Sequence, residues 1–328
     1  MNLMNTLTYE GQEYTCRAEE TVLECLTRHG VALPSSCHAG ICQTCLMRSY
    51  KGKPPEMAQK GLKATLQAQD YFLACICRPQ EDMEIGLLPQ EQAWKSVEVL
   101  EQEAVAADIY RLRLSLPDDF SYEPGQYINV KSPAEAIRSY SLASIKPEDY
   151  LELHVKHIPG GKVSTWLCVT LKGGDEISIN GPIGSCFYLP PSRPSSPKPI
   201  LLAGTGTGLA PLYGILRTAL QEGHDAPVHL FHGSLAPEGL YLVDELMQLA
   251  QEYNQFSYTP CVLKDGQLDL HQVGAIQDLI KASYPSLSGW QIYLCGDPEL
   301  IKILRMQCFL SGAGMEDIFS DPFEPARA

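Results

Sequence analysis

The feature that most constrains this chain is the spacing of three cysteines near its N-terminus, Cys37, Cys42 and Cys45. They form a C-x4-C-x2-C run, and a further cysteine follows well downstream. Four thiolates with this spacing bind a plant-type [2Fe–2S] cluster, three of them from one loop and the fourth from another element. The spacing therefore predicts that the first third of the chain is an electron-carrying domain.

The loop around these cysteines consists of small residues and includes Gly40, so it can turn tightly and aim backbone N–H groups at the sulfurs. The fourth thiolate is open on the residues alone, because Cys75 and Cys77 both follow an apolar run and a strand would send them the same way. Scattered structural cysteines and a zinc site are the alternatives. Zinc sites usually pair two C-x2-C units, and only one is present.

Composition excludes several classes of protein. The chain has 328 residues, which suits two or three domains, and its net charge of −14 argues against nucleic acid as a partner. Its start has neither a basic segment nor an apolar run, and no stretch is long and apolar enough to span a membrane. With twelve cysteines held as thiols, we expect a reducing, cytoplasmic location.

Two proline-bearing stretches, residues 86–92 and 189–199, are candidate linkers. They predict three domains, with boundaries at 1–90, 91–195 and 196–328. The first combines short strands with a helix near 21–29, as in a β-grasp ferredoxin. The second alternates apolar and polar residues between Gly/Pro turns, which favours an antiparallel β-barrel. The third alternates strands and helices, which favours an α/β domain with a parallel sheet.

A short run in the barrel segment, Arg138, Ser139, Tyr140 and Ser141, lies at a predicted strand end. A flavin with a pyrophosphate needs a cation, an aromatic wall beside its ring system and a small polar group near the reactive ring nitrogen. Arg138, Tyr140 and Ser141 supply these three groups, although a surface strand with an incidental arginine would show the same residues.

A second run fits the same ligand, reading as strand, glycine turn and helix. The first turn of such a helix offers free N–H groups to the pyrophosphate of a flavin dinucleotide. The candidate residues of this run are His154, Val155, Lys156, Gly161, Lys162, Val163 and Ser164.

The third segment opens with a glycine-rich loop between a buried strand and a helix. Its alternate glycines let the backbone approach a pyrophosphate, and the helix adds positive potential. The loop departs from the G-x-G-x-x-G fingerprint. Its candidate nucleotide-binding residues are Gly204, Thr205, Gly206, Thr207, Gly208 and Pro211.

These motifs together resemble the ferredoxin–NADP reductase superfamily with an N-terminal plant-type [2Fe–2S] domain, and in particular the reductase components of bacterial multicomponent, Rieske-type oxygenases. The resemblance implies that Cys75 is the fourth ligand and that position 43, here glutamine, commonly holds glycine. It implies that Tyr140 stacks on the flavin and that Ser141 lies near its N5. It also implies FAD rather than FMN. Three other cysteines are then expected to be buried free thiols: Cys16, Cys25 and Cys77.

The same resemblance assigns the end of the chain. Cys295 and Gly296 match the family's Cys-Gly-x-Pro motif, which borders the nicotinamide, and Phe323 matches a C-terminal aromatic residue near the flavin. The segment after the second strand of this domain has no arginine or lysine for a 2′-phosphate. The sequence therefore favours NADH over NADPH.

The order of the three sites predicts an enzyme that passes electrons from NADH through FAD and the [2Fe–2S] cluster to a terminal oxygenase component. Tyr140, Ser141 and Cys295 are the residues expected at the reacting ring. A di-iron monooxygenase or a sugar-deoxygenation enzyme is the alternative acceptor. A redox-sensing protein without rapid turnover is the alternative of another class, but a sensor would not need an intact nicotinamide loop.

Overall fold

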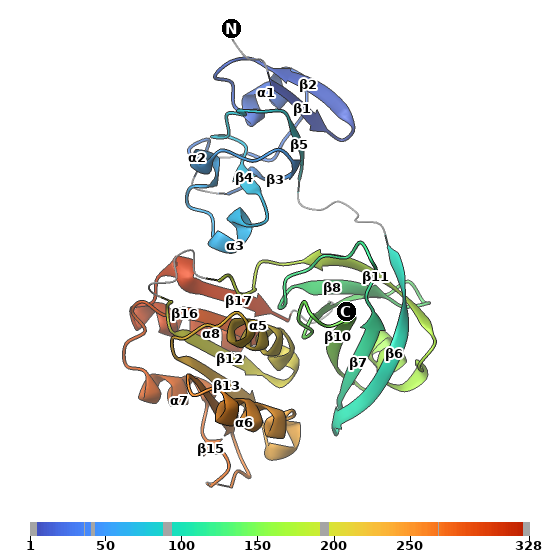
Figure 1. Ribbon diagram of the computed structural model, residues 1–328, viewed down its shortest axis with the longest axis vertical. Coiled ribbons are helices and arrows are strands. Elements are labelled where there is room, and N and C mark those ends of the chain that lie inside the picture. The colour runs from blue at the N-terminus through green and yellow to red at the C-terminus, as the bar shows by residue number, and fades with distance from the viewer. Residues whose placement is uncertain are drawn as a thin grey trace. The chain divides into compact units, whose positions relative to one another are not determined.

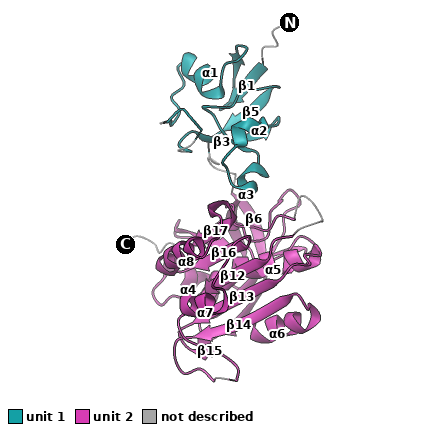
Figure 2. Ribbon diagram, turned by 90° about the vertical axis from the view of Figure 1, so that its left-hand side faces the viewer, with its two compact units in different colours: residues 1–92 teal, residues 93–328 magenta. Residues whose placement is uncertain are grey.

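The computed structural model describes residues 5–35, 37–40, 43–87, 94–190, 197–267 and 269–323. The chain divides into two compact units, residues 1–92 and 93–328, which Figure 2 distinguishes by colour. The two stretches predicted as linkers fall largely outside the described residues. No helix in the described ranges is both long and apolar enough to cross a bilayer.

The first unit is built on a five-stranded mixed sheet with the order β2-β1-β5-β3-β4 (Figure 1). β1 and β5 run parallel, and the other neighbours run antiparallel. The strands are β1 (Asn5–Tyr9), β2 (Gln12–Cys16), β3 (Leu46–Lys51), β4 (Tyr71–Leu73) and β5 (Met83–Gly86), and the helices are α1 (Val22–Arg28), α2 (Glu56–Gln59) and α3 (Ala64–Gln67). This arrangement confirms the predicted β-grasp.

Helix α1 occupies the stretch where the sequence predicts a helix. Thr21 caps its N-terminus in a capping box, since the Thr21 hydroxyl accepts from the Glu24 N–H and the Glu24 carboxylate accepts from the Thr21 N–H. The buried face of α1 packs against Leu7 and Met47 of the sheet. The cap fixes where the helix begins, and the apolar face fixes how it lies on the strands.

The second unit begins with a six-stranded antiparallel sheet, order β10-β7-β6-β11-β8-β9. A bridge between Leu142 and Leu153 joins the end of β9 to β10 and closes the sheet into the predicted barrel. Its strands are β6 (Lys95–Ala106), β7 (Ile109–Ser115), β8 (Tyr127–Lys131), β9 (Ile137–Ser141), β10 (Tyr150–Lys156) and β11 (Glu176–Ile183). Helix α4 (Lys162–Thr165) follows β10 and continues into a π-helical turn, η1 (Trp166–Thr170).

The rest of this unit is a six-stranded parallel sheet, order β15-β14-β13-β12-β16-β17 (Figure 1). Strand residues alternate between its faces, so Leu202 packs in the cluster of α5 and α6 and Leu201 in that of α7 and α8. The strands are β12 (Ile200–Thr205), β13 (Val228–Ser234), β14 (Phe256–Val262), β15 (Gln272–Val273), β16 (Gln291–Gly296) and β17 (Ile318–Pro322). The helices are α5 (Leu209–Gln221), α6 (Val243–Glu252), α7 (Ile276–Ser283) and α8 (Pro298–Leu310), with 3-10 turns η2 (Gly206–Gly208), η3 (Pro237–Gly239) and η4 (Met315–Asp317).

Candidate cofactor sites

Three of the four predicted cluster ligands lie in the described residues, and Cys42 lies outside them. Cys37 is exposed, Cys75 is half-buried and Cys45 is buried. The Ala39 N–H points at the Cys37 sulfur, at 3.4 Å, as expected for a loop that stabilises thiolates. Burial and a contact with the Cys45 thiol raise the pKa of Cys75 to about 11. The donor set fits a [2Fe–2S] cluster, because thiols from two separate elements converge.

The expectation that a strand sends Cys75 and Cys77 the same way is wrong. Strand β4 ends at Leu73 and residues 74–76 form a turn, in which the N–H groups of Ile76 and Cys77 both donate to the Leu73 carbonyl at 3.1 Å. The turn places Cys75 beside Cys45, whereas Cys77 is fully buried and burial alone raises its pKa to about 12. The geometry therefore favours Cys75 as the ligand, and Cys16, Cys25 and Cys77 are buried thiols as predicted.

Gln43, at the position where the resemblance implies glycine, has a φ of 58°. This left-handed conformation favours glycine, because an L side chain then crowds the backbone. The Gln43 amide donates to the Gly61 carbonyl at 3.4 Å, which anchors the loop to the segment before α3. The loop thus keeps the turn that glycine would give, at some cost in strain.

The flavin candidates on β9 differ in their surroundings. Arg138 and Ser139 are exposed, Tyr140 is half-buried and Ser141 is buried. Burial raises the pKa of Tyr140 well above its ordinary value, so its hydroxyl stays neutral. An exposed cation, a half-buried ring and a buried hydroxyl within four residues fit a ligand that runs from solvent into the protein.

Ser141 has a partner that the sequence analysis missed. Its hydroxyl donates to Asp321 Oδ2 at 3.0 Å, across the contact between β9 of the barrel and β17 of the parallel sheet. Burial raises the pKa of Asp321 to about 6, and the bond from Ser141 opposes the rise. The signal was in the C-terminal stretch that the sequence analysis singled out for Phe323, because the carboxyl group of Asp321 lies two residues before that ring.

The second candidate flavin-binding run begins with a histidine, His154, whose side chain is buried instead of being free to bind a ligand. The His154 ring is buried, with Nε2 at 3.1 Å from Glu152 and Nδ1 at 3.0 Å from the Tyr241 hydroxyl, so this side chain is already engaged. Burial would raise the pKa of Glu152, but hydrogen bonds from His154 and Arg113 lower it to about 2. The ionised carboxylate accepts from His154 Nε2–H, which leaves Nδ1 to accept from Tyr241 when the ring is neutral.

The remaining residues of this run surround a turn. Val155 and Val163 are in the barrel core, whereas Lys156 is exposed and pairs with Asp108 at 3.3 Å. The Ser164 hydroxyl accepts from the Ile158 N–H at 3.2 Å and so closes the turn. The Gly161 N–H already donates to the Ile158 carbonyl at 2.8 Å, whereas the N–H groups of Lys162, Val163 and Ser164 at the start of α4 have no acceptors within the helix and suit an anion.

A cavity of about 710 Å³ opens at the carboxyl ends of the parallel strands. The glycine-rich loop lines it with Thr205, Gly206 and Thr207, and Gly206, with a φ of 53°, has open space where a Cβ would stand. A Cβ at Gly208 would lie 2.3 Å from the Cys295 carbonyl oxygen, so only glycine lets the loop pack on β16. This is where nucleotides bind open α/β sheets.

The other predicted nucleotide residues have structural places around the same loop. Gly204 lies opposite Cys295 of the neighbouring strand in the ladder, and Pro211 is buried in the first turn of α5. Gly296 and Phe323 line the cavity, and the Phe323 N–H donates to the Gly296 carbonyl at 2.8 Å. Cys295 itself is fully buried, behind the cavity wall.

The outer part of the cavity wall is apolar. Leu235 and Leu263 line it with exposed apolar side chains, 60 % and 55 % accessible. Ser234, at the end of β13, lines the cavity in the segment that the sequence analysis found to lack a cation for a 2′-phosphate, and the lysine among the lining residues, Lys156, comes from the barrel. These features fit NADH.

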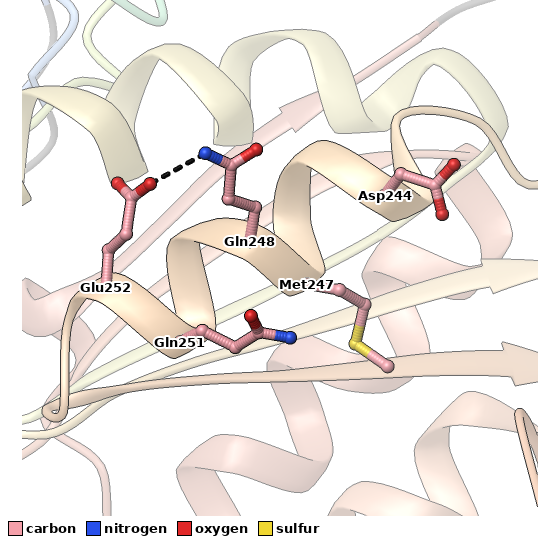
Figure 3. Close-up of a pocket in the computed structure, with 5 residues that line it drawn as sticks. All are labelled: Asp244, Met247, Gln248, Gln251 and Glu252. Carbon is pink, nitrogen blue, oxygen red and sulfur yellow. Dashed lines mark hydrogen bonds between the residues drawn. The ribbon is translucent and has the colours of Figure 1, made fainter.

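A second hollow, of about 610 Å³, lies on the outer face of α6 (Figure 3). All its lining residues come from that one helix, and Gln248 donates to Glu252 at 2.7 Å within it. Within the described part of the chain, no groups from separate elements converge there, so it is a surface groove beside a solvated helix face.

The comparisons with known proteins agree with this geometry. A "2Fe-2S iron-sulfur cluster binding domain" model matches residues 5–80, an "Oxidoreductase FAD-binding domain" model matches residues 96–188, and an "Oxidoreductase NAD-binding domain" model matches residues 202–306. The fold and sites thus define an NAD-dependent flavoprotein oxidoreductase with a [2Fe–2S] domain.

Comparison with individual proteins identifies the family within this class of oxidoreductases. The chain is 35% identical to the reductase subunit of an aromatic O-demethylase from Amycolatopsis, over 89% of this chain and 90% of that one. It is 31% identical to the ferredoxin–NAD(P)+ reductase component of a naphthalene 1,2-dioxygenase system from Pseudomonas putida, over 94% of each chain. The crystal structure of the Amycolatopsis cytochrome P450 reductase GcoB superposes with a TM-score of 0.69 at 32% identity, covering 98% of this chain and 99% of that one. The chain belongs to the family of reductase components of oxygenase systems, and its acceptor is an oxygenase component.

Proposed function

We propose that this protein takes two electrons from NADH and delivers them singly to a Rieske-type terminal oxygenase. The observation that carries the proposal is the convergence of Ser141, Asp321 and Cys295 where the barrel meets the parallel sheet, beside the nucleotide cavity. Relatives support a Rieske-type acceptor, since they include reductase components of naphthalene and terephthalate 1,2-dioxygenase systems.

In the proposed mechanism, this chain's residues bind and orient. The chemistry that bound FAD would supply is acceptance of a hydride and release of its electrons one at a time. Arg138 and the first turn of α4 would hold the dinucleotide's phosphates, Tyr140 would pack against the flavin ring, and the loop 204–208 would hold the NADH pyrophosphate. Ser141 Oγ lies within hydrogen-bond distance of Asp321, whose pKa of about 6 lets this pair hold or release a proton near neutral pH.

A cytochrome P450 is the second candidate acceptor. The observation that favours it is the 35% identity to an aromatic O-demethylase reductase subunit and the likeness to the P450 reductase GcoB. Presenting the NADH-reduced protein separately with a Rieske oxygenase and with a P450 separates the two, because the true acceptor is reduced faster at low concentration. We also propose a cytoplasmic location, because buried thiols such as Cys16, Cys25 and Cys77 persist in a reducing compartment.

An anaerobic NADH titration tests the electron path. We expect flavin bleaching in the visible spectrum, followed by a rhombic [2Fe–2S] signal in low-temperature EPR, with iron and flavin quantified in the same sample. Zinc without iron, or a flavin that NADH cannot reduce, would overturn the proposal.

Two matched variants test the cluster ligand. Cys75→Ser should keep NADH-dependent ferricyanide reduction and lose most cytochrome c reduction, because the second acceptor takes its electrons from the cluster. Cys77→Ser removes a thiol two residues away that the structure buries in the core, and it should keep both activities. Equal behaviour of the two variants would contradict the assignment of Cys75.

A substitution in the cavity tests the preference for NADH. Ser234→Arg places a cation at the end of β13, where a 2′-phosphate would lie, and should raise the rate with NADPH relative to NADH. An unchanged ratio in steady-state rates would argue against this placement of the adenosine.

A further inference from the structure

Two thiols from different parts of the second unit meet in its interior. Cys186 lies in the irregular segment that follows β11, and Cys295 is near the end of β16. Their sulfur atoms are 3.9 Å apart, and the residues are 5 % and 0 % exposed. The pair therefore joins the segment that leaves the barrel to a strand of the parallel sheet.

The two cysteines differ in how far their backbones can move. Cys295 is held in the ladder between β12 and β17, opposite Gly204 and Asp321. Cys186 belongs to no strand or helix, so it can shift without breaking a sheet. A disulfide requires the sulfurs to come roughly 1.9 Å closer. Rotation about the two Cα–Cβ bonds and a small movement of the Cys186 segment can supply this approach.

We propose that Cys186 and Cys295 form a reversible intramolecular disulfide when the protein meets hydrogen peroxide. The sulfur of Cys186, the more exposed of the two, attacks the peroxide, breaks its O–O bond, becomes a sulfenic acid and releases water. The sulfur of Cys295 then attacks the Cys186 sulfur and expels a second water. The two thiols lose two electrons in total, peroxide takes up both, and an added dithiol reverses the reaction by thiol–disulfide exchange.

The disulfide would act on the nucleotide site through direct packing. The Cys295 carbonyl lies against Gly208 of the pyrophosphate loop, with no room for even a Cβ between them. Cys295 also lies opposite Asp321 in the ladder between β16 and β17, and the Asp321 carboxylate accepts a hydrogen bond from the Ser141 hydroxyl. A disulfide therefore pulls on Cys295 as the Cys186 segment moves toward it, and this pull strains the loop and the Ser141–Asp321 pair together. This consequence rests on the proposed function, whereas formation of the disulfide does not.

Mass spectrometry of the peroxide-treated full-length holoprotein tests the proposal. Free thiols are blocked with iodoacetamide, the protein is digested, and a cross-linked peptide containing Cys186 and Cys295 is sought. We expect this peptide in the wild type, its loss after dithiothreitol, and its absence from Cys186→Ala. Cys308→Ala, which removes a fully buried thiol of α8, is the matched control and should keep the cross-link.

Flavin reduction by NADH in the same samples gives the functional readout. Displacement of a reacting group by about 1 Å can cost ~100-fold in rate, so we expect the oxidised wild type to slow at least tenfold and to recover with dithiothreitol. Cys186→Ala should not slow. The visible absorbance of the cluster is followed throughout, so that loss of iron is not mistaken for the disulfide effect.

The outcomes of these experiments distinguish failure of the disulfide proposal from failure of the proposed function. If both cysteines carry iodoacetamide after peroxide treatment of protein that keeps its cluster, the proposal is overturned. A cross-link that leaves flavin reduction unchanged would overturn the coupling to the nucleotide loop. Failure of untreated protein to reduce its flavin with NADH would instead refute the proposed function, and the cross-link result would stand.

Discussion

Replacing Asp321 by asparagine should stabilise the second unit, and more so as the pH rises. Burial raises the pKa of Asp321 from 3.8 to about 6. The folded protein therefore keeps this proton between about pH 4 and 6, where the unfolded chain has released it, and the contribution of Asp321 to stability falls as the pH rises through that window. The asparagine side chain cannot ionise, but it keeps an oxygen that accepts from Ser141.

The size of the effect follows from the shift. A difference of about 2.2 pKa units is worth about 3 kcal/mol, because each unit corresponds to about 1.4 kcal/mol. Applying the linkage relation to these two pKa values, the pH-dependent gain of Asp321→Asn is about 1 kcal/mol at pH 4.5 and about 3 kcal/mol at pH 7.5. Any effect of the substitution that does not depend on pH cancels in the difference between these conditions.

Thermal unfolding followed by FAD fluorescence measures the gain, because release of the flavin reports on the second unit alone. A change of about 2 kcal/mol corresponds to roughly 4–8 °C for a unit of this size, so the gap in melting temperature between variant and wild type should widen by that amount from pH 4.5 to 7.5. A constant gap would refute the reasoning, since it would show that Asp321 is as easily ionised in the folded protein as in the unfolded one.

Two further substitutions probe other parts of the molecule. Tyr241→Phe removes the hydroxyl that faces His154 Nδ1 and should lower the free energy of unfolding by about 1–3 kcal/mol, because a buried ring nitrogen loses its partner. The temperature of flavin release on heating measures this loss, and an unchanged melting temperature would show that the contact contributes nothing. Gln43→Gly relieves the strain of the left-handed backbone at that position and should stabilise the first unit by about 1 kcal/mol. The temperature at which the cluster absorbance bleaches on heating measures this gain. Bleaching at a lower temperature in the variant would show that the Gln43–Gly61 contact outweighs the strain.

The sequence predicted the three folds because each rests on a local pattern. Alternation along 109–116 defined a barrel strand, and the glycine loop after a buried strand defined the start of α5. The cluster loop followed from cysteine spacing alone. These signals lie within a few residues of one another, so no knowledge of the tertiary fold was needed to read them.

What the sequence could not show depends on contacts between distant segments. The bond from Ser141 to Asp321 spans 180 positions, and the approach of Cys186 to Cys295 spans 109. The local geometry of Cys75 and Cys77 was misjudged for a related reason: β4 ends early, and hydrogen bonds to Leu73 turn the chain where alternation suggested a strand. Periodicity identifies elements, but it does not say where a strand stops or which side chains meet after folding.

The exposed leucines of the nucleotide cavity, Leu235 and Leu263, influence how NADH affinity responds to temperature and to salt concentration. Leu235 and Leu263 are more than half exposed, so covering them removes apolar surface from water. Burial of apolar surface gives binding a negative heat-capacity change and involves no charge that salt could screen. The lysine that lines the cavity, already paired with Asp108, adds little attraction that salt could screen. The contribution of these two leucines to NADH affinity should therefore persist in concentrated salt, whereas salt screens the attraction between the glycine-rich loop and the pyrophosphate.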